Sequence, residues 1–150
     1  MNKESSSVRE AYRESVKQAL DEVARIGKAD IVVGIPFYNE VDTIGHVVEV
    51  AKEGLNTYYP DQRSVICCVG APEGDHALAT VLRIPLPEEL RCIAFLMRSQ
   101  MVSGKGWALR AIGEVAEKLD AALIILEADL LSRESEGRVE GLSPQWLSLL

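Results

Sequence analysis

The sequence is poor in cysteine, and its few cysteines do not form a recognisable framework. There are three among 150 residues. Cys67 and Cys68 are adjacent, so they cannot easily meet disulfide geometry with each other, and no paired C-x-x-C spacing suggests a zinc site. Both lie in the apolar segment "SVICCVG", which is typical of a buried strand. We therefore interpret them as small core residues in a protein of a reducing compartment.

The sequence also lacks an excess of positive charge and any long apolar run. Lys and Arg number 16 against 23 Asp and Glu, which gives a formal net charge of -7. This charge provides no electrostatic footprint for a nucleic-acid polymer or an anionic membrane. Apolar runs such as residues 121–126 are too short to cross a bilayer, and "MNKESSSVREAY" has no signal-peptide core. We predict a cytoplasmic protein that does not bind nucleic-acid polymers.

Hydrophobic periodicity is well developed along the chain. Hydrophobic residues make up 47% of it and charged residues 26%, as in an ordinary globular domain. Amphipathic helices are expected at residues 5–27, 40–55, 74–83 and 104–119, and apolar strands at 29–36, 63–70, 91–97 and 121–126. This alternation predicts an α/β, Rossmann-like fold: a mainly parallel sheet of buried strands with helices on both faces. Residues 1–28 form an N-terminal helix that packs on a domain spanning 29–150, and the polar stretch after Asp129 is expected to be a loop.

Candidate ligand-binding segments follow from the rule that open parallel sheets bind ligands beyond the carboxyl ends of their strands. The rule selects residues 36–40, 70–75, 98–105 and 127–129. In the third, "SGKGWALR", Lys105 stands between two glycines where a helix begins, so backbone amides, helix dipole and ammonium could hold a phosphate. P-loop and dinucleotide spacings are both absent, and a helix-starting turn with a solvated lysine remains the alternative.

The fourth segment carries two carboxylates, Glu127 and Asp129, one residue apart. In extended geometry they project to the same side and could hold Mg²⁺ or Mn²⁺, which would bridge to phosphate oxygens. The alternative is that they only solvate the end of the strand. Trp107, close to Lys105, is expected to pack against the core rather than to face the ligand.

Four blocks in order, "IVVGIPFYNEVDTIGHVV", "GKGWALRAI", "LIILEADL" and "GLSPQWLSLL", resemble the signature of nucleotide-diphosphate-sugar glycosyltransferases with the GT-A fold, family 2 type. The resemblance runs from about Ala29 to the C-terminus. It implies metal-dependent transfer of a sugar from a nucleotide-diphospho-sugar donor to a small polar or glycan acceptor. It places the D-x-D metal ligand at Asp129. With Gly70 added from the strand-end rule, the candidate nucleotide-sugar-binding residues are Pro36, Tyr38, Asn39, Glu40, Gly70, Lys105 and Glu127.

Two departures from the family pattern matter. After the second strand the chain has "CVGAPEGD" instead of "DDGS", so the usual base-contacting aspartate is missing, and Glu73 or Asp75 could partly substitute. A similar loosening in the mannosylglycerate and glucosyl-phosphoglycerate synthases suggests a small polar acceptor. The family also continues beyond the "SPQW" block with its acceptor side. We therefore expect a donor-binding part truncated at its C-terminus, with the catalytic base beyond Leu150 and an apolar segment around Trp146 that favours a homo-oligomer.

Two other functions stay open at this point. A sugar-phosphate nucleotidyltransferase-like enzyme shares the general architecture, but it needs a glycine-rich basic loop after the first strand, and "PFYNE" is not one. A non-catalytic nucleotide-sugar-binding or assembly module would keep the pocket without the transfer.

Overall fold

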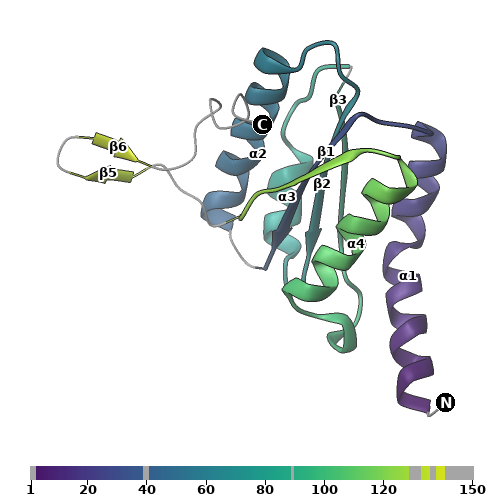
Figure 1. Cartoon of the computed structure of the whole chain (residues 1–150). Coiled ribbons are helices and arrows are strands. Elements are labelled where there is room, and N and C mark those ends of the chain that lie inside the picture. The colour runs from purple at the N-terminus through teal and green to yellow at the C-terminus, as the bar shows by residue number, and fades with distance from the viewer. Residues whose placement is uncertain (1–2, 39–40, 89, 129–132, 136–137, 141–150) are drawn as a thin grey trace.

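The computed structural model describes residues 3–38, 41–88, 90–128, 133–135 and 138–140 (Figure 1). The chain alternates helices and strands from its first element onward. In chain order the elements are α1 (Lys3–Ile26), β1 (Ile31–Phe37), α2 (Val41–Tyr58), β2 (Ser64–Gly70), α3 (Asp75–Leu82), β3 (Leu90–Leu96), the 3₁₀ turn η1 (Gln100–Val102), α4 (Lys105–Lys118), β4 (Ala122–Ile125), β5 (Arg133–Ser135) and β6 (Arg138–Glu140). The predicted helices and main strands are thus present, with ends that differ by a few residues.

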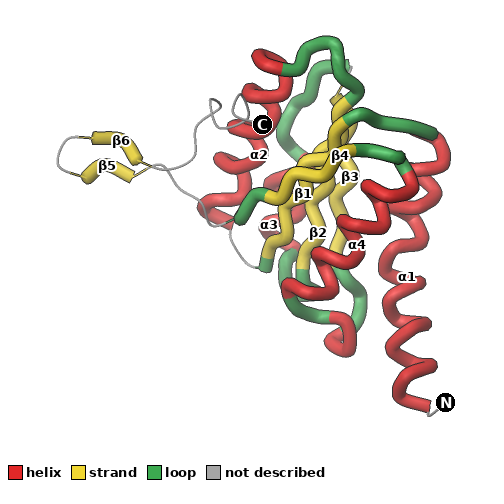
Figure 2. The backbone as a smooth tube through the Cα atoms, in the orientation of Figure 1, coloured by secondary structure: helices red, strands yellow, loops and turns green. Residues whose placement is uncertain are grey.

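The main sheet is parallel and has the order β3-β2-β1-β4. The chain therefore builds outward from β1 through β2 to β3 and then returns to place β4 on the other side of β1. Crossovers between parallel strands are right-handed, so reversing the direction of building moves the connecting helix to the opposite face. Accordingly α2 and α3 cover one face of the sheet, and α4 covers the other together with α1 (Figure 2).

The inner strands are buried because both of their faces are covered by helices. Every residue of β1 and of β2 is buried. Alternate residues of each strand feed the two cores, so Ile66 and Cys68 pack toward α2 and α3 while Cys67 packs toward α1 and α4. This confirms the α/β fold class with its parallel sheet between helical layers.

The cysteines confirm their interpretation as core residues. Cys67 and Cys68 have no exposed surface, and burial raises the pKa of the Cys67 thiol.

No cluster of three or more His, Cys, Asp or Glu side chains suited to a metal ion occurs among the described residues. In the part of the chain that the structure describes, no helix is both long and apolar enough to cross a membrane.

The N-terminal helix α1 packs onto the sheet as predicted. Its buried side chains, Tyr12, Val16, Ala19 and Val23, recur at helical spacing and join the core formed with α4. The buried Ser15 hydroxyl accepts a 2.9 Å hydrogen bond from the backbone N–H of Arg98, just beyond β3. This bond fixes α1 to the carboxyl end of the neighbouring strand.

Two expectations about the last third of the chain were wrong. The strand at 121–126 was expected to be buried, but β4 lies at the edge of the described sheet, where Leu123 is 41% exposed and Ile125 38%. An apolar sequence predicts a strand, but it does not predict whether that strand lies in the centre or at the edge of the sheet. The stretch after Asp129 was expected to be a loop, whereas β5 and β6 pair antiparallel within it, with Glu134 opposite Val139.

Candidate functional site

The pairing of β1 shows where the sheet opens. β1 pairs with β2 along its whole length, as far as Phe37 opposite Gly70, but with β4 only as far as Gly34 opposite Ile125. The carboxyl ends of β1 and β4 therefore separate at the point where the strand order reverses. In open parallel sheets ligands bind in the crevice beyond the carboxyl ends of the strands at such a switch point.

A pocket of about 270 Å³ lies in this crevice. It brings together residues at the carboxyl ends of β1, β2 and β4 with residues at the start of α4. Its lining consists of Pro36, Phe37, Tyr38, Ala71, Gly104, Lys105, Glu127 and Ala128. Four of the predicted site residues, Pro36, Tyr38, Lys105 and Glu127, are thus neighbours in space.

The charged pair in the pocket joins two of the predicted segments. The Lys105 Nζ lies 2.5 Å from Glu127 Oε1, and the two side chains are 56% and 46% exposed. Both charges therefore face solvent and are available to a ligand. A ligand phosphate would compete with Glu127 for the ammonium, and a cation would compete with Lys105 for the carboxylate.

The start of α4 supplies further donors at the pocket. Gly104 is the N-cap residue with φ 113°, a conformation that disfavours any residue with a side chain, and no side chain caps the helix. The backbone N–H groups of the first turn therefore remain without a side-chain cap, and the partial positive charge of the helix terminus adds to the charge of Lys105. Together they place positive charge and uncapped N–H donors at one corner of the pocket.

A hydrogen bond from α2 fixes the loop after β4. The Thr43 hydroxyl donates a 2.6 Å hydrogen bond to the carbonyl oxygen of Ala128. It holds the backbone next to Glu127 against the first turn of α2. Sequence reasoning missed Thr43 because its partner lies 85 positions away. It also missed Phe37, Ala71 and Ala128, which carry no polar side chain that would mark them as pocket residues.

Gly70 does not line the pocket, although the strand-end rule had selected it. A Cβ atom at this position would lie 2.3 Å from the Phe37 ring. The absence of a side chain at Gly70 therefore makes room for the Phe37 ring, and Phe37 does line the pocket. Gly70 acts on the pocket by positioning its neighbour.

The second strand-end segment carries two acids, Glu73 and Asp75. Glu73 accepts a hydrogen bond from the Gln100 side chain, and Asp75 is exposed in the first turn of α3. Neither residue is part of the pocket lining. The prediction that one of them substitutes for a base-contacting aspartate stays a prediction.

Several predicted residues lie outside the described residues. These are Asn39 and Glu40 of the first block, Asp129 of the acidic motif, and the segment around Trp146.

For a divalent cation, the pocket offers the Glu127 carboxylate, an oxygen ligand of the type that Mg²⁺ and Mn²⁺ prefer. Mg²⁺ is often held by one or two carboxylates together with waters and substrate phosphates, so this donor fits such an ion in type.

Trp107 packs against the protein and not into the pocket. Its ring centroid lies 5.8 Å from that of Tyr12 on α1, and it belongs to the partly buried edge of the core between α1 and α4. This confirms the packing interpretation.

Neither the family models, nor the curated proteins, nor the solved structures give a match to the chain.

Proposed function

We propose that this chain binds a nucleotide-diphospho-sugar in the pocket between β1 and β4 and is the donor-binding part of a metal-dependent glycosyltransferase. The observation that carries the proposal is the place of Lys105: its ammonium lies at the switch point of the sheet, at the start of α4, beside a carboxylate. This combination suits a diphosphate and a divalent cation better than it suits a neutral ligand. The resemblance of the four sequence blocks supplies the class of donor.

In this proposal the pocket residues act on the diphosphate. Lys105 and the free amides of the first turn of α4 bind its oxygens, and their positive charge stabilises the negative charge that develops as the diphosphate leaves the sugar. A bound Mg²⁺ or Mn²⁺ would supply further neutralisation of the same charge. Glu127, with Asp129 as the principal ligand implied by the resemblance, would hold that ion.

The walls of the pocket fit the remainder of a nucleotide. Pro36 and Phe37 are buried and form an apolar side, while Tyr38 is 53% exposed and presents a ring at the rim. Aromatic faces are suited to stack on a nucleobase. The acceptor, a small polar molecule or a glycan, stays a proposal that rests on the resemblance alone.

A thermal-shift panel tests the proposal. UDP-, GDP- and ADP-sugars are added with Mn²⁺ or with a chelator, and the melting temperature is measured. A ligand at 100 times its Kd stabilises the folded state by about 2.7 kcal/mol, which for a chain of this size raises Tm by roughly 5–10 °C. We expect such a shift for one of these donors with Mn²⁺. No shift with any nucleotide-sugar at millimolar concentration would contradict the proposal.

A second measurement separates an enzyme from a binding module. Release of nucleotide diphosphate from the stabilising donor is followed over hours with Mn²⁺, with and without candidate acceptors. Turnover that is lost in Lys105→Gln supports the transferase and argues against the non-catalytic alternative. Stable binding without turnover is expected both of a donor-binding part alone and of the non-catalytic alternative, so only turnover separates them.

A further inference from the structure

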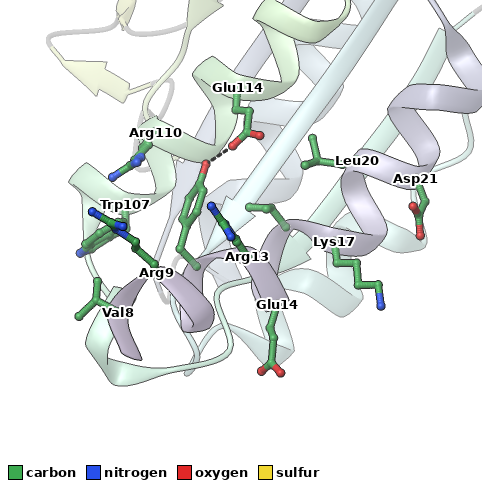
Figure 3. Close-up of a pocket in the computed structure, with 12 residues that line it drawn as sticks. Val8, Arg9, Arg13, Glu14, Lys17, Leu20, Asp21, Trp107, Arg110 and Glu114 are labelled. Atoms are coloured by element: carbon green, nitrogen blue, oxygen red, sulfur yellow. Dashed lines mark hydrogen bonds between the residues drawn. The ribbon is translucent and has the colours of Figure 1, made fainter. Parts of the chain in front are cut away.

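A second hollow lies on the other side of α4, between α4 and α1. It is an open groove of about 880 Å³ that lies between neighbouring sides of α1 and α4 (Figure 3). Its floor is aromatic and apolar, with Tyr12 and Trp107 in contact at a tilt of 41°. The groove is separate from the pocket at the switch point and shares no residue with it.

Three arginines gather at the aromatic end of this groove. Arg9 and Arg13 come from successive turns of α1, and Arg110 comes from α4 (Figure 3). The Arg110 guanidinium lies 4.9 Å from the centroid of the Tyr12 ring and 5.4 Å from that of Trp107. None of the three arginines takes part in a salt bridge within the described part of the chain.

The groove lining carries four cations and three carboxylates. One carboxylate, Glu114, accepts a 2.7 Å hydrogen bond from the Tyr12 hydroxyl. Glu14 and Asp21 project away from the three arginines, and Lys17 projects to the same side as these two acids (Figure 3). The arginines therefore outnumber the acids on their side of the groove, and they gather over an aromatic floor in a chain whose net charge is -7.

We propose that this groove, which we call the α1–α4 groove, binds an acidic segment of a partner protein in extended conformation. Arg9 and Arg13 are four residues apart on α1, which in a helix is about 6 Å. Alternate side chains of an extended peptide are about 6.6 Å apart and lie on one side of it. Carboxylates at every second position therefore match the spacing of these two arginines, and guanidinium groups pair well with carboxylates.

The aromatic floor gives the segment an apolar anchor. Trp107 is partly buried and lines the groove next to Val8 of α1 (Figure 3). A leucine-sized side chain within an acidic segment would pack there while its neighbours meet the arginines. Charge and apolar contact together favour a peptide over a simple inorganic anion, which could use only the arginines.

Two other occupants fit the observations less well. An anionic membrane would need an apolar helix face to insert, but the apolar face of α1 is already buried against the sheet. A second copy of this acidic chain would bring its own net charge of -7 toward the first, and like charge opposes association. A partner that offers an acidic segment without this bulk charge avoids both costs.

Fluorescence polarisation of a labelled peptide tests the proposal on the full chain. The probe is a ten-residue peptide that alternates glutamate with alanine and carries one leucine near its centre. A peptide of the same composition with its glutamates in one block tests the spacing, and a lysine version tests the charge. We expect binding by the alternating peptide, weaker binding by the blocked one, none by the lysine version, and a decrease with added salt.

Substitutions locate the site. Arg9→Gln, Arg13→Gln and Arg110→Gln should each raise the peptide Kd roughly two- to fivefold, as expected for exposed charge pairs, and the triple variant roughly tenfold or more. The matched control is Arg25→Gln on the same helix, whose side chain pairs with Glu22 outside the groove. It should change the Kd less than twofold. Thermal melting of every variant checks that the fold is intact.

Each of four other outcomes would overturn the proposal. These are no binding of the alternating peptide at millimolar concentration, equal binding by the wild-type chain and the triple variant, arginine-dependent binding to vesicles with 30% phosphatidylserine instead of to the peptide, and an arginine-dependent dimer in light scattering.

Discussion

Replacing Lys105 by glutamine should weaken the binding of a nucleotide diphosphate while leaving the binding of the corresponding nucleoside unchanged. In the unliganded chain Lys105 contacts Glu127 at 2.5 Å, and because both side chains are about half exposed this pair contributes only about 0.2–1 kcal/mol. A charge-assisted bond to a phosphate oxygen contributes about 1.5–3 kcal/mol. The ligand replaces the first contact by the second, so the expected loss is about 0.5–2.8 kcal/mol, or a roughly 2- to 110-fold higher Kd.

Isothermal titration calorimetry with the diphosphate and the nucleoside, both in Mn²⁺, measures this difference. The control is Lys118→Gln, which removes an equal charge from the last turn of the same helix, far from the pocket. That variant should bind both ligands as the wild type does. An equal loss of nucleoside and diphosphate affinity in Lys105→Gln would refute the reasoning, because only the phosphates can use the ammonium.

Three further changes have expected outcomes. Glu127→Gln should lower the metal-free Kd for the diphosphate roughly two- to fivefold in calorimetry, because Lys105 loses a competing partner, and Mn²⁺ should then strengthen binding less than it does in wild type. Gly70→Ala should destabilise the fold by about 1–3 kcal/mol in urea melts, because its Cβ would overlap the Phe37 ring, and adding Phe37→Leu should recover part of that loss. Burial, together with the hydrogen bond to a carboxylate, raises the pKa of Tyr12, so the folded state favours its protonated form. The free energy of unfolding should therefore fall as pH rises above about 10, and Tyr12→Phe should remove this decrease in melts between pH 8 and 11.

Each of the three has an outcome that contradicts it. For Glu127, it is a lower affinity for the diphosphate in the absence of metal when Glu127→Gln removes the carboxylate charge. For Gly70, it is an alanine variant as stable as the wild type, or one that the smaller side chain at Phe37 does not rescue. For Tyr12, it is an unchanged slope of stability against pH in the phenylalanine variant.

The helices, the inner strands and the fold class could be read from the sequence alone. Their signals are local: apolar residues recur every three or four positions in α1, and β1 and β2 are nearly continuous apolar runs. Such patterns depend only on which neighbours share a face, so they survive without knowledge of the whole chain. The glycine-flanked Lys105 was found in the same way, as the start of a helix after a strand.

The tertiary structure decided the order of the strands in the sheet and which distant residues became neighbours. The apolar sequence of β4 is compatible with a central strand, yet the return of the chain across β1 places it at the edge of the described sheet, with Leu123 exposed. The same return brings Glu127 beside Lys105, which is 22 positions away in the sequence. It also brings α4 beside α1, where the Tyr12 hydroxyl donates a hydrogen bond to Glu114, 102 positions away. Local periodicity says which side of an element is apolar, but it does not say which other element covers that side. The pocket at the switch point and the α1–α4 groove both arise from that second choice, which is made by the order of the strands and the handedness of their crossovers.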